Sequence, residues 1–191
     1  MCEGRIYIAS AFQNTQEPGY CSGNEVDNDP HVWNKPYTWG ICRPDLRNTI
    51  NKGDYVFFVL GKKAKPQMIF AYVKIKEIIC HKEAYFRKEL RKKRMGRKKV
   101  QGNIIVDKKG NHNKFDHHKN FHEIKKRYAV AYINKSRKLM EKDIERKSKD
   151  FVRVLRKILH KKGKMPIDII SRKGRRLNEL QVKHLLKWLK S

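Results

Sequence analysis

Three aromatic side chains within seven positions form the part of the sequence best suited to hold a flat, neutral ligand. Trp33, Tyr37 and Trp39 alternate around Pro36 in the segment WNKPYTW. A nucleobase gains about 1–3 kcal/mol by stacking on an aromatic ring, and it reaches such rings only when it is unpaired or flipped out of a duplex. The spacing therefore predicts either a slot with two of the rings as walls, or rings that fill the core beneath a long loop.

The residues after the aromatic segment could complete such a slot. Gly40 has no Cβ, so the backbone from Gly40 to Cys42 could approach a ligand closely and read the edge of a base. Arg43 could contact a phosphate, or it could pair with Asp45 or Asp54. The residues predicted to bind a base are Trp33, Tyr37, Trp39, Gly40, Cys42 and Arg43.

The distribution of charge indicates the class of partner. Residues 1–60 carry 5 Lys and Arg against 7 Asp and Glu, a net charge of −2, whereas the whole chain has a net charge of +28. Residues 61–191 therefore carry a net charge of +30. Such a chain attracts polyanions because binding releases their counterions. Nucleic acid is the expected partner, ahead of an anionic membrane, since no apolar run approaches the roughly 18 residues of a membrane span.

Two basic segments are predicted to hold phosphates. Residues 81–100 contain 10 Lys and Arg against 2 Glu, and SRKGRR at 171–176 is nearly as basic. Contacts to phosphate supply affinity and position without selecting a sequence. The predicted backbone-binding residues are Arg91, Lys92, Lys93, Arg94, Arg172, Lys173, Arg175 and Arg176.

A histidine-rich segment offers a different chemistry. Its imidazoles lie within eleven residues, close to Asp107 and Asp116, at His112, His117, His118 and His122. His118 and His122 are four apart, so a helix would align them on one metal ion, as in a metal-dependent nuclease. The favoured interpretation is an exposed polar loop, because no cysteine pair and no matching strand-helix pattern surround it. We expect a binding module without metal or cofactor, and enzymatic activity stays open.

The cysteines and the N-terminus indicate the compartment. The four cysteines, at positions 2, 21, 42 and 80, form no C-x-x-C pair, which is typical of reduced thiols. The N-terminal residues Met-Cys-Glu-Gly do not resemble a signal peptide. A cytoplasmic location is expected.

The elements that must position these residues follow from hydrophobic periodicity. Strands are expected at 5–11, 37–42, 55–60, 67–80, 102–106, 127–133 and 167–170, and helices at 44–50, within 81–100 and within 140–162. A final helix should begin at Asn178, with Gln181 completing a capping box. These elements predict an α+β fold around a mixed or barrel-like sheet with peripheral basic helices. We expect one domain over residues 1–191, with basic helical insertions near 81–100 and 138–162.

Several of these residues also carry a family resemblance. Cys42-Arg43-Pro44, Leu46-Arg47 and Gly53-Asp54-Tyr55-Val56 match, in order and spacing, the N-terminal signature of the nucleotide modification associated domains. The segment 102–116 is similar to a second block of that family, and the final helix with Trp188 also fits. A Phe-aromatic-Phe-Gly step typical of the family is missing from IDIISRKGRR, so a C-terminal wall of a pocket is not expected from it.

The resemblance implies a PUA-like or EVE-like fold that handles modified bases, in a mostly prokaryotic and phage-encoded family associated with DNA modification or restriction. It implies DNA in preference to RNA, and partner proteins from a modification or defence system. Two alternatives remain at this level: the metal-dependent nuclease using residues 107–122, and a PUA-like RNA-binding module that does not read modifications.

Overall fold

The computed structural model describes residues 3–9, 29–32, 34–61, 66–96 and 102–191. The chain divides into two compact units. The first unit comprises residues 1–20, 53–74 and 137–191, and the second comprises residues 21–52 and 75–136. The expectation of a single domain with basic insertions stays a prediction. Trp33, one of the predicted base-binding residues, lies outside the described residues.

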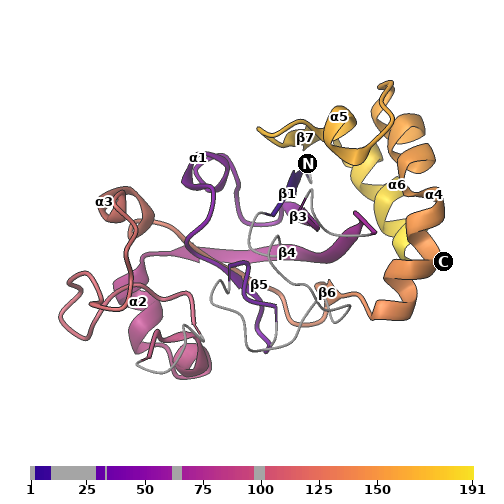
Figure 1. Cartoon of the computed structure of the whole chain (residues 1–191). Helices are drawn as coiled ribbons and strands as arrows, with labels where there is room; N and C mark the ends of the chain where they lie inside the picture. The colour runs from indigo at the N-terminus through magenta and orange to yellow at the C-terminus, as the bar shows by residue number, and fades with distance from the viewer. Residues whose placement is uncertain (1–2, 10–28, 33, 62–65, 97–101) are drawn as a thin grey trace. The chain divides into compact units, whose positions relative to one another are not determined.

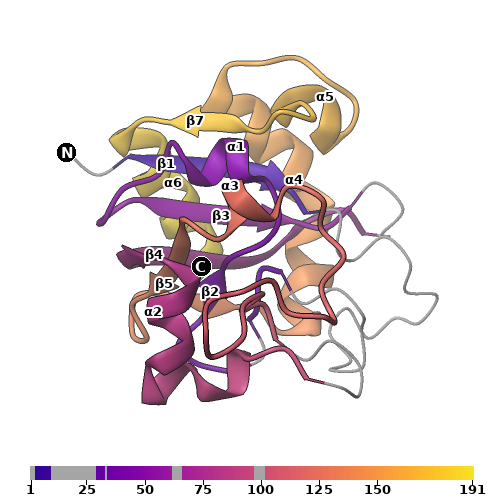
Figure 2. The ribbon, with the colours of Figure 1, turned by 90° about the vertical axis from the view of Figure 1, so that its left-hand side faces the viewer.

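The first unit is built on strands that run side by side in Figure 2. β1 (Gly4–Ile8) pairs in parallel with β3 (Tyr55–Val59) and antiparallel with β7 (Arg175–Leu177). β4 (Ile69–Ile79) pairs antiparallel with β3 and with β6 (Arg137–Lys138). The aromatic run of β3 is buried, since Phe57 and Phe58 are both 0% exposed. This burial explains why β3 is apolar on both faces.

Three helices complete the first unit (Figure 1). They are α4 (Glu141–Leu159), α5 (Pro166–Ile170) and α6 (Glu179–Lys190). The apolar stripe of α4 is buried through Ile144, Phe151 and Leu155, as its helical spacing predicted. The start of α6 at its capping box is confirmed: the Asn178 side chain accepts the Gln181 N–H, and the Gln181 side chain accepts the Asn178 N–H.

The second unit contains the other half of β4, whose residues 75–79 pair antiparallel with β5 (Tyr128–Ala131). β5 in turn pairs antiparallel with β2 (Thr38–Trp39). Its helical segments are α1 (Pro44–Arg47), α2 (His81–Phe86), the 3₁₀ helix η2 (Lys88–Lys93) and α3 (Phe121–Ile124). An apolar cluster that includes Leu90, Ile104, Ile105 and Tyr128 forms the core of this unit.

The predicted α+β class with a mixed sheet is confirmed, with seven strands in the described part of the chain. The PUA-like form of the sheet stays a prediction. Residues 102–106 form isolated bridges at Ile104 and Val106 in place of the expected strand. The expected strand at 37–42 is limited to Thr38 and Trp39, because residues 40–42 are held by side chains.

One further expectation near the C-terminus is wrong, and another holds only in part. Residues 167–170 belong to helix α5, because Pro166 occupies its first turn and the Asp168 carboxylate accepts the N–H of Met165 at 2.9 Å. A short apolar run suits a buried helix as well as a strand. The basic segment 171–176, which the sequence indicates as a loop, is one only in part: residues 171–174 form a turn, whereas Arg175 and Arg176 belong to β7, which pairs with β1.

Candidate nucleic-acid interface

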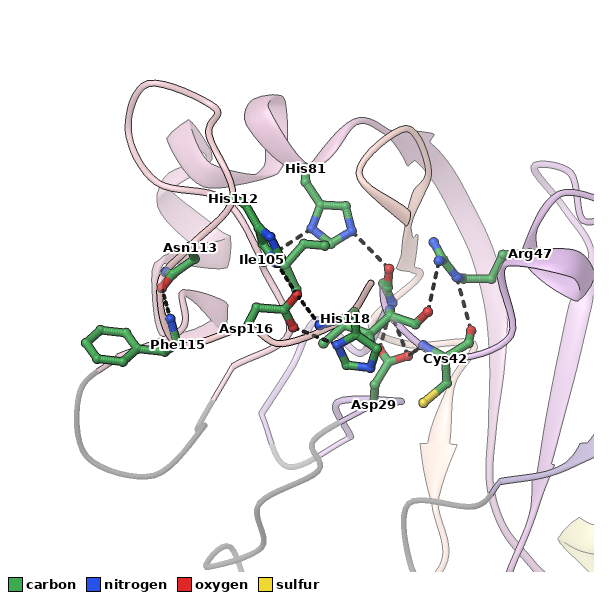
Figure 3. Close-up of polar contacts among 12 residues, drawn as sticks. Asp29, Cys42, Arg47, His81, Ile105, His112, Asn113, Phe115, Asp116 and His118 are labelled. Carbon is green, nitrogen blue, oxygen red and sulfur yellow. Dashed lines mark hydrogen bonds and ion pairs between the residues drawn. The ribbon is translucent and has the colours of Figure 1, made fainter. Parts of the chain in front are cut away.

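The backbone of residues 40–42 is held by the carboxylate of Asp29, which is 0% exposed (Figure 3). Oδ1 accepts the Gly40 N–H at 2.7 Å, and Oδ2 accepts the N–H groups of Ile41 and Cys42 at 2.8 and 2.5 Å. Asn103 Nδ2 donates to Oδ1 at 2.7 Å. Burial raises the pKa of Asp29, whereas the Arg47 guanidinium and these hydrogen bonds oppose that shift.

The carbonyl groups of the same three residues are also engaged. His81 Nδ1 accepts the Ile105 N–H, so its Nε2–H donates to Gly40 O at 2.9 Å. Burial lowers the pKa of His81 to about 3, which keeps the ring neutral. Arg47 donates to the carbonyls of Ile41 and Cys42 at 3.1 and 3.2 Å. The backbone N–H and C=O groups of Gly40, Ile41 and Cys42 are therefore all hydrogen-bonded within the second unit.

Two of the predicted aromatic residues are also enclosed. Trp39 is 1% exposed and Tyr37 is 8% exposed. A Cβ on Gly40 would lie 2.5 Å from the Tyr128 ring, so its close approach serves internal packing. Arg43 forms a bidentate ion pair with Asp45, at 2.9 and 2.7 Å, which is one of the alternatives left open by the sequence. The aromatic base slot stays a prediction. The backbone N–H groups of Gly40 to Cys42, which were expected to read a base, are already bonded to Asp29.

The predicted backbone-binding residues lie in different environments. Arg91, Lys92, Arg172 and Lys173 are exposed. Arg176 pairs with the carboxylate of Glu3, and Arg175 Nε donates to Ile169 O at 3.1 Å. Arg94 donates to Tyr85 O, and its guanidinium lies 4.3 Å from the centre of that ring. The basic segments are therefore brought to the surface only in part.

Lys93 departs most from the expectation, since it is 0% exposed. Its Nζ donates to Asn34 O at 2.5 Å and lies 2.8 Å from His31 Nδ1. Burial lowers the pKa of Lys93 to about 7. The Lys93 ammonium therefore contacts acceptors inside the second unit. It is not at the surface, where a phosphate would bind.

A basic groove in the first unit runs along α4 and α6, which lie side by side in Figure 1. Its volume is about 610 Å³. Five basic residues and one acidic residue, Asp150, contribute to the lining. We call it the α4–α6 groove; its lining residues are Arg146, Lys147, Asp150, Arg153, Val154, Lys157, Ile158, His184, Lys187, Trp188 and Ser191.

An aromatic pair supports the groove. The rings of Phe151 and Trp188 stack with centres 5.8 Å apart and planes 9° apart. Lys147 Nζ lies 5.2 Å from the centre of the Trp188 ring and donates to Trp188 O at 2.6 Å. Arg153 and Lys157 are exposed one helical turn apart on α4, and Lys187 is exposed on α6. The cationic groups thus lie on two helices, and the packing of these helices sets the distances between the groups.

The histidine segment forms a second cavity, of about 560 Å³, within the second unit. Asp116, whose side chain is 2% exposed, lies beneath it and is bonded to two imidazoles (Figure 3). His112 Nε2 is 2.6 Å from Oδ2, and His118 Nδ1 is 2.7 Å from Oδ1. Burial favours a higher pKa for Asp116, but the hydrogen bonds from His118 and His112 hold that pKa below its ordinary value.

Two further properties concern the described residues alone. Across residues 3–9, 29–32, 34–61, 66–96 and 102–191, no three His, Cys, Asp or Glu side chains are arranged to hold a metal ion. The helices in the same ranges are all too short or too polar to cross a bilayer.

The comparisons with known proteins identify the family. The model of nucleotide modification associated domain 2 matches residues 20–190. The chain therefore belongs to this family, as the motifs around Cys42 and Gly53 predicted. No curated protein and no solved structure matched the chain.

Sequence reasoning found α4 as a basic helix but missed the residues of α6 that share its groove. A signal was present: Arg146, Asp150, Arg153 and Lys157 recur every three or four residues, which places them on one face of a helix. Nothing in the local sequence shows that Lys187 of α6 lies beside that face. The network around Asp29 carried no local signal, since its partners are up to 74 residues away.

Proposed function

We propose that this chain binds nucleic acid along the α4–α6 groove and recognises a modified base in that nucleic acid. The observation that carries the proposal is the groove itself, where five basic residues and one acidic residue share a lining about 610 Å³ in volume. Lysine and arginine neutralise phosphates and release counterions, which supplies affinity for any sequence. The family supports the second part of the proposal, because its members are associated with nucleotide modification.

Recognition of a base would require more than the groove. Phosphate contacts position a nucleic acid, and contacts to base atoms select among sequences. We include in the proposal that the base is unpaired or flipped when it is read, since a modification enclosed by stacked neighbours is otherwise hard to reach. DNA is the proposed nucleic acid, and a modification or defence system is the proposed setting.

The groove is tested by removing three of its exposed cations together. Arg153→Ala, Lys157→Ala and Lys187→Ala should weaken binding to a short fluorescent DNA duplex, measured by anisotropy over a range of salt concentrations. Each lost phosphate contact flattens the plot of log K against log salt by about 1, so the triple variant should flatten it by about 3.

A matched control removes the same charge elsewhere. Lys52, Lys108 and Lys126 are exposed residues of the second unit, and their triple alanine variant should keep a steeper salt dependence than the groove variant. Equal slopes for the two variants would show that the α4–α6 groove has no special role.

A further inference from the structure

The cavity of the second unit has a lining rich in hydrogen-bond donors. Six of its residues carry imidazole or ammonium groups: His112, His117, His118, Lys119, His122 and Lys125. Asn111 adds an amide, and none of the lining residues is acidic. A ligand with several acceptor oxygens and negative charge would be complementary to this lining.

Asp116 orients two of the imidazoles from below. An ionised carboxylate only accepts hydrogen bonds, so His112 donates through Nε2–H and His118 through Nδ1–H. This fixes the tautomer of both neutral rings. The other nitrogen of each ring, Nδ1 in His112 and Nε2 in His118, is the one that can turn a proton toward a ligand once the ring is charged.

Phe121 gathers three of the lining residues around one ring. The His112 ring stacks on it with centres 4.2 Å apart and planes 16° apart. The His122 ring meets it edge-on at 5.5 Å, and Lys125 Nζ lies 5.1 Å from its centre. Phe121 is 8% exposed and is part of the apolar core of the unit. The side chains of His112, His122 and Lys125 therefore all contact one ring that is packed in the core.

We infer that this cavity is a phosphate-binding site, which takes the phosphate group of a nucleotide or of free inorganic phosphate. A cation is disfavoured there because Lys119 and Lys125 would repel it, and because the carboxylate of Asp116 already accepts two imidazole donors. The inference is independent of the α4–α6 groove, which belongs to the first unit. It gives the histidine segment a role that neither the metal interpretation nor the exposed-loop interpretation assigned.

Calorimetric titration of the full chain tests the inference with three probes: inorganic phosphate, a nucleoside 5′-monophosphate and the same nucleoside without phosphate. Both phosphate-bearing probes should bind, because the donors of the cavity are complementary to phosphate oxygens, and the nucleoside should not bind. Equal affinity for the two phosphate-bearing probes would identify the free phosphate group as the ligand. Tighter binding of the monophosphate would identify a nucleotide.

Two variants make the test specific. His118→Gln with His122→Gln should weaken phosphate binding about a hundredfold, since each hydrogen bond to a charged group is worth about tenfold. Lys119→Ala changes an exposed side chain and should also weaken binding. His160→Asn, an exposed change in the first unit at a left-handed position that Asn tolerates, should leave phosphate binding unchanged.

Three results would overturn the inference: no binding of phosphate by the unmodified chain, equal binding by all variants, or binding of the bare nucleoside as tight as that of its monophosphate. The triple groove variant separates this site from the proposed function. It should lose duplex affinity and keep phosphate binding, whereas the histidine variant should keep the salt dependence of duplex binding.

Discussion

The carboxylate of Asp29 accepts the N–H groups of three consecutive residues, which is how concave backbone segments bind anions. In this chain the anion is the carboxylate of Asp29 itself. The segment 40–42, which carries part of the family signature, is therefore rigidly held by its own side-chain partners. A motif at these positions is explained by packing and hydrogen bonding without a bound ligand.

Replacing Asp29 by Asn should strongly destabilise the second unit. An amide has only one acceptor oxygen, and its NH₂ group would face N–H donors that lose their partner. Leaving buried donors unsatisfied costs about 1–3 kcal/mol each, so we expect the free energy of unfolding to fall by about 3 kcal/mol in urea denaturation. Asp45→Asn, at an exposed ion pair, should change it by less than about 1 kcal/mol. Similar effects of the two substitutions would contradict the role assigned to Asp29.

Lys93 predicts an unusual pH dependence of stability. Its pKa is about 7 in the folded chain and near the ordinary lysine value of about 10.4 when unfolded. Between these values the unfolded chain binds one more proton, so the free energy of unfolding should rise with pH, by up to about 1.4 kcal/mol per pH unit. Below about pH 7 the folded chain also carries the proton, and this contribution no longer changes.

The rise of stability with pH should disappear in Lys93→Met, which has a side chain of similar length without the charge. Lys92→Met, at the exposed neighbouring position, should retain it. Urea denaturation of the three proteins from about pH 7.5 to about pH 9.5 measures the slopes. If Lys93→Met kept the slope of the unmodified chain, the ammonium would not be the titrating group.

At the residue scale, the sequence predicted which side chains are chemically distinctive but not where they point. Trp39 could be assigned either to a slot or to the core, and it is 1% exposed. Lys93 belongs to a run of exposed basic residues, and nothing local marks it as buried. In both cases the environment is created by residues distant in sequence, which a local pattern does not contain. Trp39 pairs with Ala129 of β5, and Lys93 Nζ contacts His31 and Asn34, which are 62 and 59 residues away.

At the scale of elements, prediction succeeded where the local signals were strong. Helix α6 is capped by Asn178 through the capping box that its sequence indicates, and its apolar residues Val182, Leu185 and Leu189 are buried. The long apolar strands β3 and β4 were also predicted. These elements have both a regular period and a defined start or end.

Prediction failed where an element is short or depends on a distant partner. The four residues 167–170 suit either a strand or a helix by composition, and the Pro166 and Asp168 contacts favour the helix α5. Among the described residues β7 is the last strand of the sheet and pairs with β1 alone, so a basic sequence is tolerated at this edge. The same distance dependence explains why α4 was recognised as basic while its groove with α6 was not.

At the scale of the whole molecule, charge and family lead to the same account. The net charge of +28 predicts a polyanionic partner, and the family assignment over residues 20–190 associates the chain with nucleotide modification. The family and the α+β class could be predicted from sequence because they depend on motif order and on hydrophobic periodicity. The PUA-like sheet, the single domain and the base slot stay predictions, because they depend on how distant segments combine.

The most direct test of the account is a salt titration with two DNA duplexes that differ only in one modified base. Both should show a plot of log K against log salt with a slope of about −4 or steeper, because phosphate contacts are common to them. The modified duplex should bind more tightly by a factor that stays constant with salt, since contacts to a base release no counterions. A slope near zero, or equal affinity across a panel of modified and unmodified duplexes, would contradict the proposed function.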